Sequence, residues 1–137
     1  YCDPTPKARY VAREPRPGMK PKPFFMTAGV RDGYFHPYSE AATAVALGAT
    51  LVGEEVEPEV PAALALDGRM TKPYPLKNNL NGVTAGVAMY GVPYELGHYV
   101  AFDREDTRYQ YTCFVAGVGT DAGPQISPLA QVDAGCL

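Results

Sequence analysis

The chain has 137 residues, of which 46 % are hydrophobic and 20 % are charged, as in folded domains rather than disordered segments. Its formal net charge of −3 provides no basic surface for nucleic acid, and no apolar run approaches the roughly 18 residues of a membrane span. The 14 prolines and 14 glycines argue against a helical bundle. We therefore expect a loop-rich globular protein that binds no nucleic acid and does not span a membrane.

Residues 1–22 are rich in basic side chains and contain several prolines, namely Pro4, Pro6, Pro15, Pro17 and Pro21. Proline fixes φ and lacks a backbone N–H, so this spacing argues against a helix or a central strand. We expect an extended lead-in here. Because the chain begins at Tyr1, with neither an initiator methionine nor an apolar signal sequence, we interpret it as a product cut from a precursor.

An apolar run at residues 23–30 predicts the first strand. The run shows no alternation of apolar and polar residues, which is typical of a strand buried on both faces of a parallel sheet. A helix is predicted to start within the segment Pro37-Tyr38-Ser39-Glu40 and to run to Leu47. Its N-cap is expected to be Ser39, and Gly48 is expected to follow its last residue.

The next part of the chain, residues 51–82, is predicted to be irregular apart from a brief extended stretch at residues 51–53. It contains an acidic, proline-rich loop and several turn-forming residues. A second apolar run predicts a strand at residues 83–90, and a last helix is expected from Asp103 to about Val118. Apolar residues at helical spacing predict the buried face of that helix: Tyr111, Phe114, Val115 and Val118.

The order strand, helix, long loop, strand, helix is that of an α/β protein with a doubly wound sheet. So few strands cannot complete such a sheet alone, and we expect another chain or segment to supply the rest. The sequence then divides into the lead-in at residues 1–22, the α/β unit at residues 23–120 and a tail at residues 121–137.

The three cysteines, Cys2, Cys113 and Cys136, allow at most one disulfide within the chain. We expect Cys113 to pair with Cys136, because this bond would join the tail to the preceding helix. Cys2 would then be free or bonded to another chain. The alternative is three reduced thiols, two of them buried. A disulfide and a tyrosine- and proline-rich composition favour a secreted or periplasmic protein.

A polar side chain with catalytic potential follows each predicted strand. Asp32 follows the first strand and His98 follows the second. A histidine that is oriented by an acid can remove the proton of a serine hydroxyl, which is how many hydrolases activate their nucleophile. Both residues could instead have ordinary roles in turns or caps. Glu95 and Asp103 are the reserve candidates for the acid.

Two motifs resemble those of α/β-hydrolases. The segment Gly29-Val30-Arg31-Asp32-Gly33 is similar to the loop that carries the acid in that family, and Gly97-His98-Tyr99-Val100-Ala101-Phe102 is similar to the loop before its last helix. The resemblance covers roughly residues 20–120, keeps the family order of acid before histidine, and is greatest for esterases, lipases and polyester depolymerases. It implies that Asp32 orients His98 and that His98 acts as general base and then as general acid.

The nucleophile that the resemblance implies is missing. Ser39 and Ser127 are the only serines, and neither lies in a Gly-x-Ser-x-Gly nucleophile elbow. We therefore expect the serine and the oxyanion hole on a companion chain or N-terminal segment, to which Cys2 could be joined by a disulfide. This chain alone is expected to be inactive.

Aromatic residues beside the two motifs are candidates for an apolar substrate site, namely Tyr34, Phe35 and Tyr99. Simple packing around the loops is the alternative. No cofactor is expected. A zinc ion bound by His36, His98 and Asp32 is a weaker alternative, since no close ligand spacing supports it.

These patterns lead to one preferred function and one alternative. The preferred function is part of a serine hydrolase that cleaves small-molecule or polymeric carboxylic esters through an acyl-enzyme. The chain would supply the aspartate and the histidine of the triad. The alternative is a secreted binding or structural module, held by a disulfide, in which both motifs are only turns.

Overall fold

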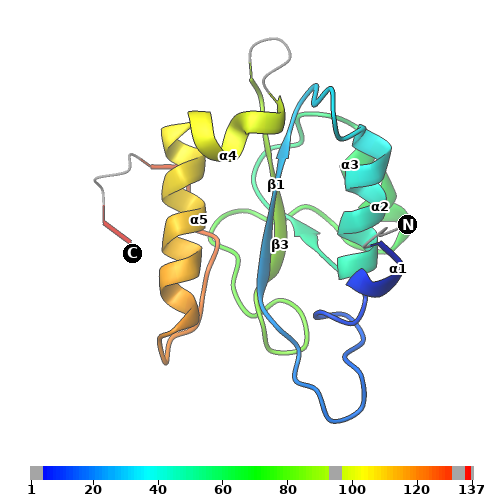
Figure 1. Ribbon diagram of the computed structural model, residues 1–137, viewed down its shortest axis with the longest axis vertical. Helices are drawn as coiled ribbons and strands as arrows, with labels where there is room; N and C mark the ends of the chain where they lie inside the picture. Colours follow the sequence, from blue (N-terminus) through cyan, green and yellow to red (C-terminus); the bar gives the residue numbers. More distant parts are fainter. Residues whose placement is uncertain (1–4, 93–96, 131–134, 137) are drawn as a thin grey trace.

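The computed structural model describes residues 5–92, 97–130 and 135–136, and a small parallel sheet lies at its centre (Figure 1). The strands are β1 (Phe24–Gly29), β3 (Ala85–Tyr90) and β2 (Thr50–Leu51), in this order across the sheet. Figure 1 shows helices on both faces, with α2 and α3 on one side and α4 and α5 on the other. The predicted α/β class is confirmed.

The central strand, β3, is buried along its whole length. Its side chains alternate between the two faces of the sheet. Val87 and Met89 belong to the core beneath α2 and α3, whereas Ala88 and Tyr90 pack with Phe114 in the core on the other side. Parallel sheets require this cover on both faces, and the apolar sequence of β3 provides for it.

The helix after β1, α2 (Pro37–Leu47), begins three residues before the start that an N-cap at Ser39 would give. Its N-cap is His36, whose Nδ1 accepts a hydrogen bond from the backbone N–H of Tyr38 at 3.4 Å. The expected cap at Ser39 is therefore wrong, because Pro37 has a φ that suits the first helical position and starts the helix earlier. The helix ends as predicted, at Gly48 with a φ of 77°.

The lead-in is folded against the domain rather than extended. It contains one helical turn, α1 (Thr5–Ala8). This turn tolerates Pro6, because backbone N–H groups in the first turn of a helix have no partner within the helix. Farther on, Ala12 is completely buried. Arg13 donates to both carboxylate oxygens of Asp67 and to the carbonyl of Val45, and so ties the lead-in to the layer of α2 and α3.

A further helix lies inside the region predicted to be irregular. This helix, α3 (Glu59–Leu66), has Pro58 at its N-cap and Pro61 in its first turn. Prolines are acceptable at these positions, and the alanine- and leucine-rich stretch that follows favours a helix. Val60 and Leu64 of α3 are almost fully buried in the core beneath it.

The predicted last helix is divided into α4 (Val100–Asp103) and α5 (Glu105–Val118) by extended backbone at Arg104. The predicted buried face is only partly right. Phe114 is buried, but Val115 and Val118 are 65 % and 53 % exposed. The helix instead turns the polar Gln110 inward, where it accepts a hydrogen bond from the hydroxyl of Tyr90 at 2.5 Å and also binds the carbonyl of Ser127.

The described part of the tail is attached to the domain at separate points. Cys113 of α5 and Cys136 form a disulfide, and Ile126, fully buried, pairs with Leu76 through an isolated bridge. Cys2 lies outside the described residues. No helix among residues 5–92, 97–130 and 135–136 is long and apolar enough to cross a membrane.

Candidate active site

The site forms at the carboxyl ends of two adjacent strands. β1 and β3 are paired in parallel from Phe24↔Ala85 to Gly29↔Tyr90, so the segments that follow them leave the sheet at the same edge. Asp32 comes directly after β1, and His98 lies in a short 3₁₀ helix, η1 (Gly97–Tyr99), just before α4. Ligand sites of open parallel sheets are characteristically found at this edge.

Two glycines bring these segments into contact. A Cβ atom on Gly97 would lie 2.5 Å from the carbonyl oxygen of Val30 and 2.7 Å from the backbone nitrogen of Asp32. A Cβ atom on Gly29 would in turn lie 2.6 Å from the Cα of Gly97. Real Cβ atoms do not approach backbone so closely, so only glycine allows this backbone contact. The contact sets His98 directly beside the loop of Asp32.

Asp32 and His98 form a hydrogen-bonded pair. Nδ1 of His98 lies 3.0 Å from Oδ2 of Asp32. The other carboxylate oxygen, Oδ1, accepts the backbone N–H groups of Tyr34 at 2.7 Å and Phe35 at 2.9 Å. The Asp32 side chain is 7 % exposed, whereas that of His98 is 39 % exposed. The acid is thus fixed behind the imidazole, and the imidazole faces solvent.

The electrostatics of the pair suit a histidine base. Burial by itself would raise the pKa of Asp32, but the N–H groups of Phe35 and Tyr34, followed by the bond and charge of His98, lower that pKa below its ordinary value. Asp32 is therefore an ionised acceptor at neutral pH. Such an acceptor stabilises the tautomer of His98 that carries its proton on Nδ1. The lone pair of Nε2 is then available to take a proton.

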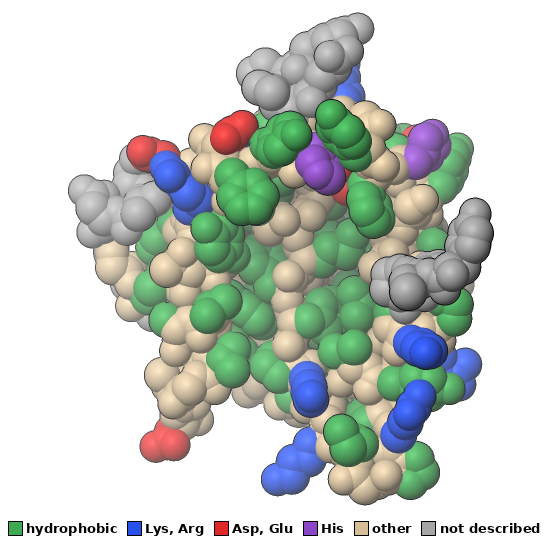
Figure 2. Space-filling model, viewed as in Figure 1, with side chains coloured by type: hydrophobic (Ala, Val, Ile, Leu, Met, Phe, Trp, Pro, Cys, Tyr) green, Lys and Arg blue, Asp and Glu red, His purple; other side chains and the backbone are tan. Residues whose placement is uncertain are grey.

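Aromatic side chains surround the imidazole at the surface. The ring of Tyr34 lies 4.7 Å from the His98 ring, centroid to centroid, and the ring of Tyr99 meets it edge-on at 5.1 Å. Phe35 and Phe102 are also exposed, and Tyr34 is 74 % exposed. Figure 2 shows hydrophobic side chains gathered around a histidine at this end of the molecule. This arrangement offers an apolar surface around the potential base.

The other candidates for the acid and for a metal site do not join this pair. His36 caps α2 and stacks on Tyr38 at 5.2 Å, and Asp103 lies at the end of α4 without a hydrogen bond to His98. Glu95 lies outside the described residues. Within residues 5–92, 97–130 and 135–136, no cluster of three or more histidine, cysteine or acidic side chains could hold a metal ion.

A serine partner for His98 is not found in the part of the chain that the structure describes. Ser39 is exposed in the first turn of α2. Ser127 is buried, and its hydroxyl binds Gln125. The only hydrogen-bond partner of the His98 ring among the described residues is Asp32. The pair therefore has an orienting acid and a base, and it lacks a nucleophile.

A buried carboxyl group beside the pair was not anticipated. Glu40, in the first turn of α2, is only 4 % exposed. Burial, followed by the negative charges of Asp32 and Glu57, raises the pKa of Glu40 to about 8. The sequence does contain an indication of this burial. Glu40 lies four residues before Ala44 and so shares a helix face with it, and alanine is a residue that packs closely against a sheet.

We expect Glu40 to make stability depend on pH. The ordinary pKa of this side chain is 4.5, so between about pH 5 and pH 8 the folded protein holds a proton that the unfolded chain has released. The free energy of unfolding should therefore fall as pH rises through this range, by at most ~1.4 kcal/mol per pH unit. Asp32 contributes no slope in this range, because its lowered pKa takes effect only in more acidic solution.

The check is urea denaturation at several pH values. Glu40→Gln should remove most of the fall between pH 5 and pH 8, since glutamine cannot ionise. Glu54→Gln, which replaces an exposed carboxyl, should keep it. If the free energy of unfolding falls equally with pH in the wild-type protein and in Glu40→Gln, Glu40 does not carry this proton.

A cavity of about 410 Å³ lies between the carboxyl ends of β2 and β3. Its lining includes Tyr74, Met89 and Arg104. Arg104 is already paired with Asp106 and bonded to the carbonyl of Gly91, so its charge is satisfied within the protein. β3 separates β2 from β1, and the lining does not include Asp32 or His98. The cavity adds nothing to the pair.

Comparisons with protein-family models, curated proteins and solved structures found no match to this chain. The hydrolase resemblance of the two motifs remains a prediction.

Proposed function

We propose that this chain supplies the acid and the base of a serine hydrolase that cleaves carboxylic esters. The observation that carries the proposal is the 3.0 Å contact between Nδ1 of His98 and Oδ2 of Asp32. The acid is held by backbone N–H groups, and the histidine is open to solvent. The two strands would then belong to the C-terminal part of an α/β-hydrolase sheet, whose remaining strands and nucleophile come from a companion segment or chain.

The proposed reaction follows from the free nitrogen of His98. Nε2 removes the proton of the companion serine as the serine oxygen attacks the ester carbonyl. Asp32 stabilises the imidazolium that forms. His98 then gives the proton to the departing alcohol and leaves an acyl-enzyme. In the second half, His98 removes a proton from water as the water oxygen attacks the acyl-enzyme, and then returns this proton to the serine oxygen as the bond to serine breaks and the carboxylic acid leaves. The oxyanion hole comes from the companion segment.

The aromatic side chains around His98 suggest the kind of substrate. The rings of Tyr34 and Tyr99 both contact the imidazole, and Phe35 is in the loop whose backbone binds Asp32. Substrate sites are typically lined by such side chains with a few polar groups that fix orientation. We therefore propose that these side chains bind the apolar part of a small or polymeric ester.

The Cys113–Cys136 disulfide supports a secreted or periplasmic location, because disulfides persist in oxidising compartments. The same bond would suit the alternative, a secreted binding module whose exposed aromatic residues contact a partner. We propose that Cys2 can join this chain to its companion by a disulfide.

A p-nitrophenyl ester assay of this chain and of the native protein with its associated polypeptides separates the two functions. The enzyme proposal predicts no turnover above background by the isolated chain, because it lacks a serine beside His98, and turnover by the native protein. A binding module predicts no turnover in either sample. Full activity of the isolated chain would contradict the companion nucleophile.

A further inference from the structure

The outer side of β1 is an open edge. The strand order β1-β3-β2 gives β1 a single neighbour. The backbone N–H groups of Phe24 and Val30 bind carbonyls of Thr84 and Tyr90, on the β3 side. Because these groups alternate in direction along a strand, those of the intervening residues Phe25, Thr27 and Gly29 point outward. No hydrogen bond to these outward groups comes from the described parts of the chain.

The opposite edge of the sheet is closed. Gly53 donates its backbone N–H to the carbonyl of Lys72, and Lys72 donates to the carbonyl of Leu51. The side chain of Asn79 also binds the hydroxyl of Thr50. The chain thus covers the outer side of β2 with its own residues, while β1, the longer edge strand, has no hydrogen-bonded strand on its outer side among the described residues.

The sequence of β1 is that of an interior strand. Proteins usually protect an exposed edge strand with charged residues or proline. Phe24–Gly29 contains neither. Phe24, Phe25 and Met26 are only partly buried. They belong to both cores, since Phe24 and Met26 pack toward α2 and α3 while Phe25 packs on Phe114 at 5.7 Å.

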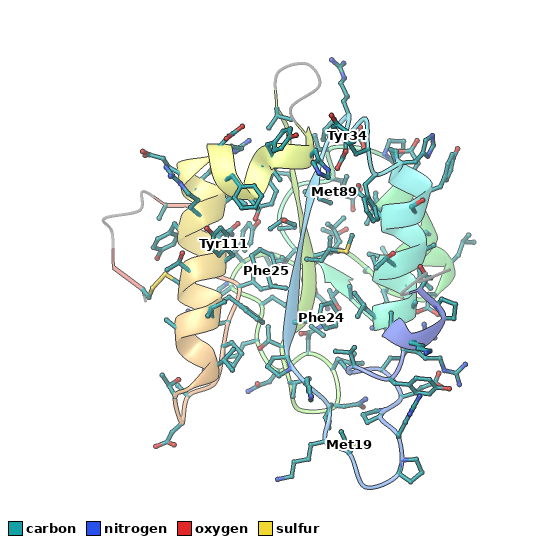
Figure 3. The ribbon with its side chains drawn as sticks, in the orientation of Figure 1. Met19, Phe24, Phe25, Tyr34, Met89 and Tyr111 are labelled. Carbon is teal, nitrogen blue, oxygen red and sulfur yellow. A yellow bond between two sulfur atoms is a disulfide. The ribbon has the colours of Figure 1, made fainter. Side chains whose placement is uncertain are left out.

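The helical layers are already in place around this edge. Figure 1 looks onto β1 in front of β3, with α5 on one side and α2 and α3 on the other. In Figure 3, Phe24 and Phe25 lie between these layers, and Tyr111 projects from α5 on the Phe25 side of β1. A strand laid along β1 would therefore have helices on both sides, as parallel strands require.

We propose that the segment which carries the nucleophile adds a parallel strand to the outer edge of β1. The inference rests on the proposed function, because the occupant is the segment that completes the Asp32–His98 pair. The carboxyl end of a parallel strand lies beside the carboxyl end of β1. The chain that follows the added strand would therefore emerge beside His98. Hydrogen bonds to Phe25 and Thr27 would hold it, and it would cover Phe25 and Met26.

A photo-crosslinker tests this placement. p-Benzoylphenylalanine, whose long side chain can reach a neighbouring strand, is introduced at Thr27, where the backbone N–H points outward, and as a control at Leu66, an exposed position on α3. The native protein with its associated polypeptides is labelled with a fluorophosphonate probe and irradiated, and the joined peptides are mapped by mass spectrometry. We expect residue 27, and not residue 66, to be joined to the segment or chain that carries the labelled serine.

The outcomes separate this inference from the function it rests on. A labelled serine with no adduct from residue 27 would overturn the edge strand and leave the hydrolase intact. An adduct between residue 27 and residues 24–29 of a second copy would also overturn it, because the edge would then form a dimer. The absence of any labelled serine would overturn the proposed function and the inference together.

A pair of substitutions gives an independent measurement. Thr27→Pro removes an outward N–H donor and leaves the bonds to β3 in place, whereas Thr27→Val keeps the donor. We expect Thr27→Pro to lower fluorophosphonate labelling of the native protein at least tenfold with no loss of helix signal in circular dichroism, and Thr27→Val to keep labelling. Equal labelling of the two folded variants would contradict the strand addition.

Discussion

Replacing His98 by alanine should lower kcat for ester hydrolysis by the complete enzyme about 10⁴- to 10⁶-fold, the range seen when a triad base is removed. Nε2 of His98 is the group that would take the serine proton, and no other titratable side chain of the described residues is hydrogen-bonded to Asp32. The measurement is single-turnover hydrolysis of a p-nitrophenyl ester by the native protein carrying the substitution.

The matched control is His36→Ala. His36 is the only other histidine, and its side chain caps α2 rather than binding Asp32, so kcat should stay within about twofold while the protein loses roughly 1 kcal/mol of cap stability. Asp32→Asn should lower kcat about 10⁴-fold, because an amide no longer fixes the tautomer of His98. Equal activity of His98→Ala and His36→Ala would remove His98 from the mechanism.

Replacing Gly29 by alanine should have the largest effect on stability. The added methyl group would meet the backbone of Gly97, with the Cα and the carbonyl carbon each 2.6 Å away. Backbone cannot move aside as a flexible side chain can, so we expect a loss of about 3 kcal/mol or more in the free energy of unfolding. Relief of the clash would also separate η1 from the Asp32 loop.

Gly33→Ala is the control for this prediction. Gly33 lies in the loop that follows β1, and a Cβ atom added there has no atom within 4 Å, so stability should change by less than about 0.5 kcal/mol. Urea denaturation measures both variants. The ring nitrogen resonances of His98 in 15N NMR report whether its bond to Asp32 persists in any folded Gly29→Ala protein. A stable variant with an unchanged spectrum would contradict the role given to the glycine contact.

The parts of the fold that follow from local sequence signals could be predicted. The apolar runs place β1 and β3 within two residues of their observed ends. Gly48 marks the end of α2, because the residue after the helix adopts the left-handed backbone conformation that favours glycine. The positions of Asp32 and His98 after these strands also follow from the sequence. Their contact depends on strand order, which is a property of the tertiary fold.

The errors occur where tertiary contacts override local preference. α3 was missed because Pro58 and Pro61 indicate a loop unless they are recognised as first-turn residues. The face of α5 was misjudged because Gln110 is buried by hydrogen bonds to Tyr90 and Ser127, and polar burial of this kind leaves no apolar periodicity. Burial of Glu40 was missed for a similar reason, since a carboxyl group in a first helical turn usually faces solvent.

Mass-spectrometric mapping of the serine that a fluorophosphonate modifies in the native protein tests the central claim most directly. We expect one modified serine, on a segment outside these 137 residues, and we expect the modification to be lost when His98 is replaced by alanine. Modification of Ser39 or Ser127, or of no serine at all, would contradict the proposal that this chain provides the acid and the base for a nucleophile carried elsewhere.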